Sequence, residues 1–496
     1  MIDVILPHTS NPSFERTLGQ FIHSALVRRV AVIHDGSFAG RSEKCDSVRS
    51  DVFASGKNFI NILGIVKADF LLIVPRVNEV MLGDSCLERL VNVLAETGSG
   101  MAYSDFYSEN EGKRSAHAVN DYQFGSIRDN FDFGLLQLYS ASAIRSALKK
   151  YGTLANVRHA ALYDLRLKVS IDHRLFHVQE FLYSVVESDA RKSGEKQFDY
   201  VDPRNQEVQK EMEQVATDYL KHIDAYLAQL FKPIPKLSGG LPVEASVIIP
   251  VRNRERTIAD AVTSALKQKT DSAFNVLVVD NHSTDKTTSI LADLARTNPR
   301  VLHLIPSRSD LGIGGCWNEA VRSQHCGRYA VQLDSDDLYS GEKALQSIIE
   351  TFRSGEYAMV IGSYKLVNMQ LEEIPPGLID HKEWTPGNGR NNALRINGLG
   401  APRAFVTQLL REHPIPNVSY GEDYAIALRL SREYRIGRIF EPIYLCRRWE
   451  GNTDSALALE QINRNDSYKD KIRTIEMLAR QSLNARGRFE PTVPQP

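Results

Sequence analysis

The chain has 496 residues, of which 60 are Lys or Arg and 61 are Asp or Glu, so its net charge is close to zero. This balance excludes a general electrostatic attraction for nucleic acid or anionic lipid, and we expect no nucleic-acid partner. A chain of this length exceeds one ordinary hydrophobic core, which predicts two domains of roughly 200 to 250 residues.

The cysteines and the apolar runs bear on the cellular location. The five cysteines are scattered, and their odd number and spacing fit neither a disulfide framework nor a zinc finger. The chain starts without a basic region followed by an apolar one, and no segment approaches the roughly 18 consecutive apolar residues of a membrane span. We expect a cytoplasmic protein, while peripheral contact with the inner face of a membrane and homo-oligomer formation stay open.

Short runs rich in Val and Ile alternate with stretches of helical spacing in both halves of the chain, which predicts an α/β fold with mainly parallel, Rossmann-like sheets. The same order of elements occurs twice, which indicates an internal duplication, although any two α/β domains look similar at this level. The predicted strands cover residues 4–7, 30–33 and 70–74 in the first half, and residues 246–250, 275–280 and 329–333 in the second, where helices are predicted at 257–267 and 287–297.

The domain boundary is expected between the two sets of strands. A helical pattern over residues 206–230 is followed by a Pro- and Gly-rich run at 232–242, which is typical of a stiff linker. We expect an N-terminal domain over residues 1–200, a helical linker over 201–243, a second domain over 244–490, and a disordered tail after about residue 487.

The acidic cluster Asp334-Ser335-Asp336-Asp337 directly follows the predicted strand at 329–333. Open α/β sheets bind ligands beyond the carboxyl ends of their strands. Three adjacent carboxylates repel one another, and a divalent cation would relieve this repulsion and leave ligand positions for phosphate oxygens. The alternative is a solvated turn whose aspartates cap the next helix.

Two further acidic positions are candidates. Asp280 ends the predicted strand at 275–280, where a carboxylate could contact the base or ribose of a nucleotide, while the residues after it read as an ordinary helix start. Glu422 and Asp423 open a predicted helix, where an acidic side chain is either a partner of the helix dipole or a general base.

In this order and spacing, the motifs resemble those of the family 2 glycosyltransferases, which have the GT-A fold and a DxD motif. The resemblance covers residues from 247 to about 455 and rests on the segments 247–253, 279–286, 311–318, 334–337, 421–423 and 444–453. It implies an enzyme that moves a sugar from a nucleotide-diphosphate sugar to a hydroxyl of a glycan, lipid-linked or other acceptor, in glycan or polysaccharide biosynthesis.

The resemblance also implies roles for single residues on the donor side. Pro250, Asn253 and Asp280 would line the nucleoside pocket. Asp334 would reach the ribose or diphosphate, and Asp336, together with Asp334, would hold a Mn²⁺ or Mg²⁺ ion that takes up charge as the nucleoside diphosphate leaves.

On the acceptor side, the resemblance makes Asp423 the base, with Glu422 as the alternative, in a single displacement that inverts the anomeric centre. Many relatives carry a His where this chain has Trp449, so the contact of that His is lost. Arg447 or Arg448 would then clamp the diphosphate, and Trp449 would stack on a sugar.

Several other features leave alternatives open. The glycines of residues 312–315 are either a phosphate loop or, more simply, a turn before a helix. The stretch 374–402, with His381, Trp384 and the adjacent Arg403, is either an acceptor-binding loop or a long surface loop. Two rival functions are a nucleotidyltransferase, whose Gly-rich loop after the first strand is absent here, and a non-enzymatic module that binds sugar nucleotides or glycans.

The N-terminal half lacks the acidic cluster. Aligning residues 70–74 with 329–333 puts Pro75 opposite Asp334 and Val77 opposite Asp336, and neither can ligate a hard cation through its side chain. We expect a degenerate GT-A-like domain without metal-dependent activity that positions the acceptor, pairs with a second chain or buttresses the catalytic half. The same alignment puts His34 opposite Asp280, where a one-residue slip would bring Asp35 instead. Asp84 and Asp105 are the other carboxylates that could act from new positions.

Overall fold

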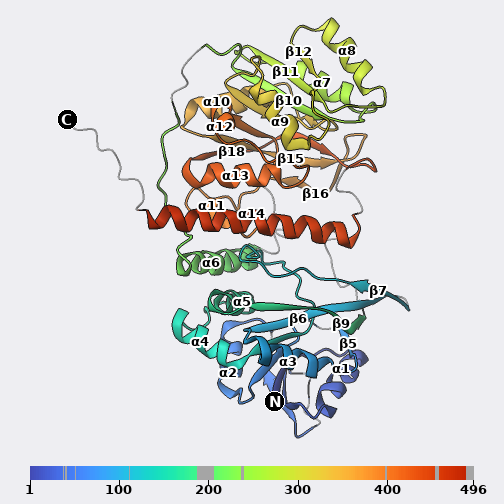
Figure 1. The fold of residues 1–496 in the computed structure, drawn as a ribbon, viewed down its shortest axis with the longest axis vertical. Helices are drawn as coiled ribbons and strands as arrows, with labels where there is room; N and C mark the ends of the chain where they lie inside the picture. The colour runs from blue at the N-terminus through green and yellow to red at the C-terminus, as the bar shows by residue number, and fades with distance from the viewer. Residues whose placement is uncertain are drawn as a thin grey trace, which may run out of the picture. The chain divides into compact units, whose positions relative to one another are not determined.

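The computed structural model describes residues 1–36, 38, 42–50, 52–76, 78–110, 112–186, 206–235, 240–396, 399–452 and 457–486. They form two compact units, the first of residues 1–226 with 458–486 and the second of residues 227–457. Each unit is an α/β domain built on a nine-stranded sheet, which confirms the predicted fold class (Figure 1). The expected tail after residue 487 and much of the expected linker at 187–205 and 236–239 lie outside the described residues.

The strands and helices of the second unit alternate as predicted. The strands at the centre of its sheet are apolar throughout, because both faces are covered; β10 buries six of its seven residues. The elements are β10 (Ala245–Val251), α7 (Ile258–Leu266), β11 (Phe274–Asp280), α8 (Thr287–Thr297), β12 (Val301–Leu304), α9 (Ile313–Arg322), β13 (Tyr329–Gln332), β14 (Leu338–Tyr339), α10 (Ala344–Ser354), β15 (Met359–Val367), β16 (Glu373–Ile379), α11 (Gly389–Asn392), β17 (Arg403–Val406), α12 (Thr407–Glu412), α13 (Glu422–Glu433) and β18 (Ile436–Arg447).

The sheet of the second unit has the order β12-β11-β10-β13-β17-β15-β18-β14, and β16 pairs with β15. Strands β12, β11, β10 and β13 run parallel to one another. Their carboxyl ends therefore meet at one edge, and the loops after β10, β11 and β13 lie together there. This edge holds most of the residues proposed from the sequence.

The first unit repeats this plan. Its sheet has the order β3-β2-β1-β4-β8-β6-β9-β5, with β7 paired to β6, so every strand has a counterpart in the second sheet. Its elements are β1 (Ile2–Pro7), α1 (Pro12–His23), β2 (Val27–His34), β3 (Cys45–Arg49), α2 (Gly56–Ile65), β4 (Phe70–Ile73), β5 (Glu79–Leu82), α3 (Cys86–Thr97), β6 (Met101–Asn110), β7 (Lys113–His117), β8 (Gln137–Ser140), α4 (Ala141–Tyr151), α5 (Ala161–Asp172), β9 (Leu175–Val186), α6 (Gln206–His222) and the C-terminal α14 (Leu459–Ala485).

The strand registers fix the correspondence residue by residue. Ile2 pairs with Phe70 in the first sheet as Ala245 pairs with Tyr329 in the second, so the predicted alignment of residues 70–74 with 329–333 holds. Pro7 pairs with Ile33 as Pro250 pairs with Val279. His34 is therefore the counterpart of Asp280, and the alignment does not shift by the one residue that would make Asp35 the counterpart.

The helices and loops correspond as well. The Tyr163 hydroxyl in α5 donates to the Ile127 carbonyl, and the Tyr424 hydroxyl in α13 donates to the Ala393 carbonyl. Both tyrosines are the third residue of a helix of 12 residues, so Asp423 has Leu162 as its counterpart. The shared strand order, registers and tyrosine contacts are what an internal duplication predicts.

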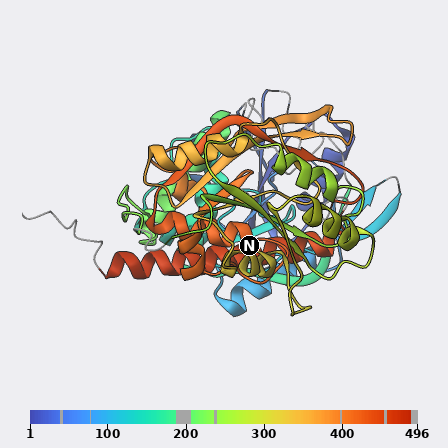
Figure 2. The same cartoon turned by 90° about the horizontal axis from the view of Figure 1, so that it is seen from above.

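The C-terminal helix α14 belongs to the first unit, although we expected the second domain to extend to residue 490. It is one continuous helix (Figure 1 and Figure 2), and its Gln481 side chain donates to the Ile223 carbonyl just after α6. The fully buried Asp470 pairs with Arg128 at 3.2 Å and with Arg473 at 2.7 Å. None of the helices in the described part of the chain combines the length and apolar character that a membrane span requires.

Candidate active site

The loops after β10 and β11 are joined by side-chain hydrogen bonds. Asn253 has a left-handed backbone (φ 54°), which Asn tolerates better than most residues. Its Oδ1 accepts from the Thr284 backbone N–H at 2.7 Å, and its own N–H donates to Ser283 Oγ at 3.0 Å. Pro250 lies half-buried near the end of β10. The two loops expected to hold a nucleoside thus form one connected rim.

Asp280 lies at the base of this rim and is fully buried. Its carboxylate accepts from the Ser283 backbone N–H at 3.0 Å and from the Thr288 hydroxyl at 2.6 Å, and His303 Nε2 lies 3.3 Å away. Burial raises the pKa of Asp280, but the hydrogen bonds outweigh burial and the net shift is downward. A nucleoside would therefore contact this carboxylate only if one of its protein partners moved away, and the direct role of Asp280 stays a prediction.

The acidic cluster forms a tight turn after β13. The Asp337 backbone N–H donates to the Asp334 carbonyl at 3.2 Å. Burial, then the charge of Asp336, raises the pKa of Asp334, although the Gln332 amide opposes this. Burial and the charges of Asp334 and Asp336 raise the pKa of Asp337 well above its ordinary value. Burial is the larger cause of both shifts, and the repulsion between the adjacent carboxylates adds to it.

Asp336 lies under the segment that follows β18. Its Oδ2 accepts from Trp449 Nε1 at 3.3 Å and from Asn452 Nδ2 at 3.2 Å, and Arg254 Nε lies 3.8 Å away. Among the described residues, no donor contacts Oδ1 of Asp336. The Arg256 guanidinium carbon lies 5.1 Å from the centre of the Trp449 ring. Trp449 therefore contacts the acidic residue directly.

The described residues contain no group of three or more His, Cys, Asp and Glu side chains arranged to hold a metal ion. A Mg²⁺-like ion needs less from the protein, because one or two carboxylates suffice when diphosphate oxygens and water fill the other positions. Asp336 offers an oxygen without a described donor, and Asp334 lies two residues away in the same crowded turn. These residues fit an ion shared with a bound diphosphate, and not a cage made by the protein alone.

Arg447, the last residue of β18, reaches this turn. It is 2% exposed, its Nε donates to the Asp336 carbonyl, and its Nη1 lies 3.2 Å from Asp260 Oδ2. Its Nη2 is buried and has no hydrogen-bond partner in the described part of the chain. The next residue, Arg448, is anchored by a backbone hydrogen bond to the Val367 carbonyl at 2.7 Å. Arg447 thus has one guanidinium nitrogen left for a further acceptor.

Glu422 and Asp423 begin α13, after Gly421, whose left-handed backbone (φ 78°) forms the helix N-cap. Asp423 is one-third exposed, and its Oδ2 lies 2.6 Å from Arg403 Nη2. Burial and the adjacent charge of Asp423 raise the pKa of Glu422 to about 8. Glu422 Oε2 is buried without a hydrogen-bond partner among the described residues. Glu422 is therefore mainly protonated at neutral pH, while Asp423 is held by a cation at the surface of the site.

The glycines before α9 serve close packing. The Gly312 and Gly314 backbone N–H groups donate to Asn417 Oδ1 at 2.8 Å and to the Val418 carbonyl at 3.0 Å. A Cβ on Gly314 would lie 1.9 Å from the Pro416 carbonyl oxygen. Because the chain itself uses these N–H groups, the segment is a packed turn before a helix, which was the simpler of the two interpretations.

The stretch 374–402 is mostly packed within the second unit, and its residues 397–398 lie outside the described part. His381 is buried, and its Nδ1 lies 2.7 Å from Glu383 Oε1. The Trp384 ring is also buried and faces Gly389, where a Cβ would lie 2.7 Å from it. Of the three residues proposed here, only Arg403 has a described contact with the acidic residues of the site.

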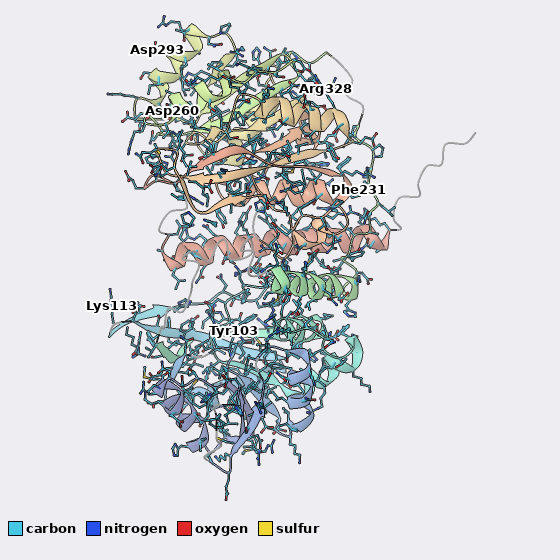
Figure 3. All side chains as sticks on the ribbon, turned by 180° about the vertical axis from the view of Figure 1, so that it is seen from behind. Tyr103, Lys113, Phe231, Asp260, Asp293 and Arg328 are labelled. Carbon is cyan, nitrogen blue, oxygen red and sulfur yellow. The ribbon has the colours of Figure 1, made fainter. Side chains whose placement is uncertain are left out.

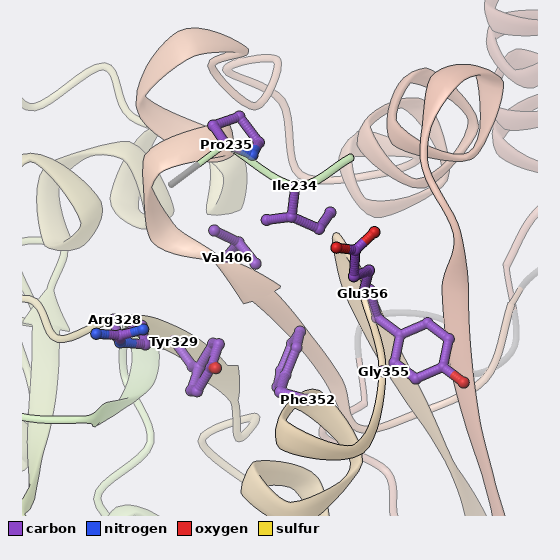
Figure 4. A pocket seen from close by; sticks show the side chains of 9 residues that line it. Ile234, Pro235, Arg328, Tyr329, Phe352, Gly355, Glu356 and Val406 are labelled. Carbon is purple, nitrogen blue, oxygen red and sulfur yellow. The ribbon is translucent and has the colours of Figure 1, made fainter. Parts of the chain in front are cut away.

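A cavity of about 350 Å³ lies at the other end of β13 (Figure 4). It is lined by Tyr329, the first residue of that strand, and by Arg328, Phe352 and Ile234 among others. Figure 3 shows Arg328 and Asp260, the partner of Arg447, on opposite sides of the second unit. This cavity is therefore separate from the acidic site.

Several polar residues of the site were not anticipated from the sequence. The Tyr444 hydroxyl accepts from the Asp334 backbone N–H at 3.0 Å, and Gln332 Nε2 donates to both Asp334 oxygens at 3.0 Å. Asn452 and Arg254 contact or approach Asp336, as described above. The one available signal was Gln332, a lone amide at the end of an apolar strand, two residues before the first aspartate.

The matching edge of the first unit is filled with aromatic side chains. His8, Phe14 and Phe38 lie within 6 Å of one another by ring centres, and Phe38 also contacts His34. Asp105 accepts from the Val119 N–H at 2.8 Å and lies 2.9 Å from His177 Nε2. Asp84 is exposed between β5 and α3, and Val77 lies outside the described residues.

Comparison with known proteins assigns much of the second unit to a family. Residues 246–413 match the family model described as "Glycosyl transferase family 2". Glycosyltransferase AglD of Haloferax volcanii is 27% identical over 201 residues, which cover 39% of this chain and 29% of AglD. In Escherichia coli, UDP-Glc:alpha-D-GlcNAc-diphosphoundecaprenol beta-1,3-glucosyltransferase WfgD is 26% identical over 198 residues, which cover 39% of this chain and 72% of WfgD.

The chain thus spans less than a third of the length of the first curated relatives, at 29% to 31%. Among solved structures, S. aureus TarS 1–349 in complex with UDP aligns with a TM-score of 0.37 and 22% identity, over 47% of this chain and 65% of that one. The family match falls on the second unit. The C-terminal half of this chain is therefore a family 2 glycosyltransferase domain, as its motifs predicted.

Proposed function

We propose that the chain transfers a sugar from a nucleoside-diphosphate sugar to an acceptor hydroxyl in glycan or polysaccharide biosynthesis, at one active site in the second unit. The observation that carries this proposal is the meeting of two acidic groups, Asp334 with Asp336 and Glu422 with Asp423, beside β13. The first group suits a diphosphate with its cation, and the second suits an acceptor hydroxyl. The relative WfgD, named for a UDP-glucose donor and a lipid-linked acceptor, supports this class of substrates.

On the donor side, Asp336 and Asp334 would hold Mn²⁺ or Mg²⁺ together with the diphosphate. Such an ion supplies Lewis-acid stabilisation of the departing nucleoside diphosphate. Arg447 would donate to a diphosphate oxygen through its buried Nη2, which has no hydrogen-bond partner among the described residues. Pro250 and Asn253 would form the rim of the nucleoside pocket.

On the acceptor side, Asp423 would take the hydroxyl proton and lead to a single displacement with inversion. Asp423 suits this role better than Glu422, because the pKa of Glu422 is raised to about 8 and a protonated carboxyl cannot accept a proton. Asp423 is also one-third exposed, so a substrate hydroxyl can reach it.

The first unit, in this proposal, has no donor site of its own. Asp334, Asp280 and Asp423 have Pro75, His34 and Leu162 as counterparts, and the aromatic cluster around Phe38 occupies the place of the nucleoside rim. Positioning of the acceptor, pairing with a second chain or buttressing of the second unit are the roles left to it.

The test is a donor screen on the full chain. UDP-glucose, UDP-GlcNAc and GDP-mannose are each incubated with Mn²⁺, Mg²⁺ or EDTA, while released nucleoside diphosphate is measured and donor binding is followed by thermal shift. We expect metal-dependent release of nucleoside diphosphate from at least one donor. A melting-temperature rise without turnover would indicate a binding module, and formation of nucleoside triphosphate and sugar 1-phosphate when pyrophosphate is added to the donor would indicate a nucleotidyltransferase.

A further inference from the structure

The side chains of Gln332 and Arg403 connect Asp334, on the donor side of the site, to Asp423, the proposed base. Gln332 Nε2 donates to both oxygens of Asp334 at 3.0 Å. Gln332 Oε1 accepts from the Arg403 backbone N–H at 3.0 Å and from Arg403 Nη1 at 3.1 Å. Arg403 Nη2 in turn lies 2.6 Å from Asp423 Oδ2. The chain Asp334–Gln332–Arg403–Asp423, which we name the carboxylate bridge, spans the site from β13 through β17 to α13.

The bridge is directional. Because Gln332 Oε1 accepts two N–H groups, a flipped amide would point its NH₂ at two donors and its oxygen at a carboxylate. Only one amide orientation therefore satisfies all the contacts of Gln332. The Arg403 side chain is 15% exposed, and the nearby charges of Asp423 and Asp334 raise its pKa against the opposing effect of burial. The guanidinium is held between the Asp423 carboxylate and the Gln332 amide in a partly dry environment, where its contacts are stronger than at the surface.

The first unit offers an internal comparison. Gln332 and Arg403 occupy the position that follows the Val331–Ala404 pair of β13 and β17. Ile73 and Gln137 pair at the matching position of β4 and β8. In the first unit, the counterparts of the four bridge residues are Pro75 for Asp334, Ile73 for Gln332, Gln137 for Arg403 and Leu162 for Asp423. None of the four bridge residues is shared by the two units.

The two units do share residues that brace the fold. Tyr163 and Tyr424 make the same contact to a carbonyl, and Tyr183 and Tyr444 hold the same register positions in β9 and β18. Since the first sheet has the same strand order without the bridge, the fold itself does not require Gln332 or Arg403. The bridge is therefore present in the unit that has the acidic residues, and the fold that both units share forms without it.

We propose that Gln332 and Arg403 are positioning residues for the transfer reaction. Gln332 fixes the carboxylate of Asp334 on the donor side, and Arg403 fixes that of Asp423 on the acceptor side. The bridge sets their separation, so the hydroxyl is presented in line with the donor. This inference rests on the proposed function. A small misplacement of a reacting group costs about 10- to 100-fold in rate, which is the effect expected when the bridge is cut.

The experiment uses the full chain and the donor from the panel that wild type hydrolyses fastest, with Mn²⁺. The variants are Arg403→Met, which keeps length and removes charge, Arg403→Lys, which keeps charge, and Gln332→Met. The matched control is Gln137→Met, at the counterpart position in the first unit. Hydrolysis kcat, donor KM and the melting temperature are measured for each protein.

We expect Arg403→Met to lower kcat about 10- to 100-fold while the donor KM changes less than about threefold. Arg403→Lys should recover part of this loss, Gln332→Met should lower kcat in the same direction, and Gln137→Met should match wild type. A purely structural brace would instead lower the melting temperature of Arg403→Met and leave its kcat unchanged, and that result overturns the inference.

The outcomes for wild type separate the two proposals. If wild type turns over a donor and both Arg403→Lys and Gln332→Met keep the wild-type kcat, the bridge has no positioning role although the proposed function stands. If wild type hydrolyses none of the donors, the proposed function fails, and the bridge, as a device for transfer, falls with it.

Discussion

Asp423→Asn removes one charge at the proposed base while keeping the shape of the side chain. Its cost to stability should be small, because the helix cap is Gly421 and not Asp423. An acidic residue in the first turn contributes about 0.3 to 1 kcal/mol through the helix dipole, and a partly exposed ion pair such as Asp423 with Arg403 contributes at most about 1 kcal/mol. We expect the melting temperature to fall by roughly 1 to 8 °C in a unit of this size.

The cost to catalysis should be larger. Loss of a general base lowers the rate about 10²- to 10⁴-fold, which corresponds to about 3 to 5 kcal/mol of activation free energy. The amide that replaces the carboxylate in Asp423→Asn cannot accept the hydroxyl proton, whereas donor binding lies on the other side of β13 and should persist.

The assay for Asp423→Asn compares release of nucleoside diphosphate at saturating donor and Mn²⁺ with donor affinity by calorimetry, on the full chain. Glu422→Gln is the matched control, because it alters the neighbouring carboxyl without touching Asp423. A wild-type rate in Asp423→Asn would refute the base assignment and leave Glu422 as the candidate.

Three further predictions follow from the contacts of the site. The pKa of Glu422 is raised from 4.5 to about 8, so the folded state binds this proton more tightly than the unfolded chain, and wild type loses stability as pH rises across that range. The melting temperature of Glu422→Gln relative to wild type should therefore increase from pH 4.5 to 8, and a constant difference would contradict the shift. Gly314→Ala should destabilise the second unit by about 3 kcal/mol or more in denaturant titrations, because its Cβ would lie 1.9 Å from the Pro416 carbonyl oxygen; unchanged stability with weaker donor binding would instead favour a phosphate loop. Trp449→Phe removes the N–H that competes with a cation for Asp336, so the Mn²⁺ concentration for half-maximal hydrolysis should fall about threefold, and a rise would show that Trp449 assists the ion.

The sequence pattern was sufficient for the fold class and for the place of the acidic cluster. Buried strands such as β10 and β11 are apolar throughout, so they stand out as runs, and ligand residues follow strand ends in an open sheet. The alignment of residues 70–74 with 329–333 worked because the two sheets bury the same positions. These features depend on local patterns that a single chain displays.

Contacts between distant segments could not be predicted in this way. Gln332 and Arg403 are 71 residues apart and meet only because β17 pairs antiparallel to β13. Asp280 looked like a ligand at a strand end, and its partner His303 comes from a different strand, β12.

The C-terminal helix shows a second limit. Its buried face carries Asp470, Arg473, Glu476 and Arg480, which pair with charged partners, so α14 has the composition of a solvent-exposed helix. Hydrophobic periodicity does not reveal a helix that docks through ion pairs. The return of the chain to the first unit was therefore missed.

The central claim is that one metal-dependent active site, built on the Asp334 turn, performs the transfer. The most direct test measures release of nucleoside diphosphate by the full-length wild type and by Asp336→Ala, with Mn²⁺ and the best donor of the panel, after circular dichroism has shown that both are folded. We predict that Asp336→Ala loses at least about 100-fold in turnover, because the proposal gives the first unit, whose Pro75 and Val77 align in sequence with the two carboxylates, no second metal site. Turnover by Asp336→Ala close to the wild-type rate at saturating Mn²⁺ would contradict both the metal site and its uniqueness.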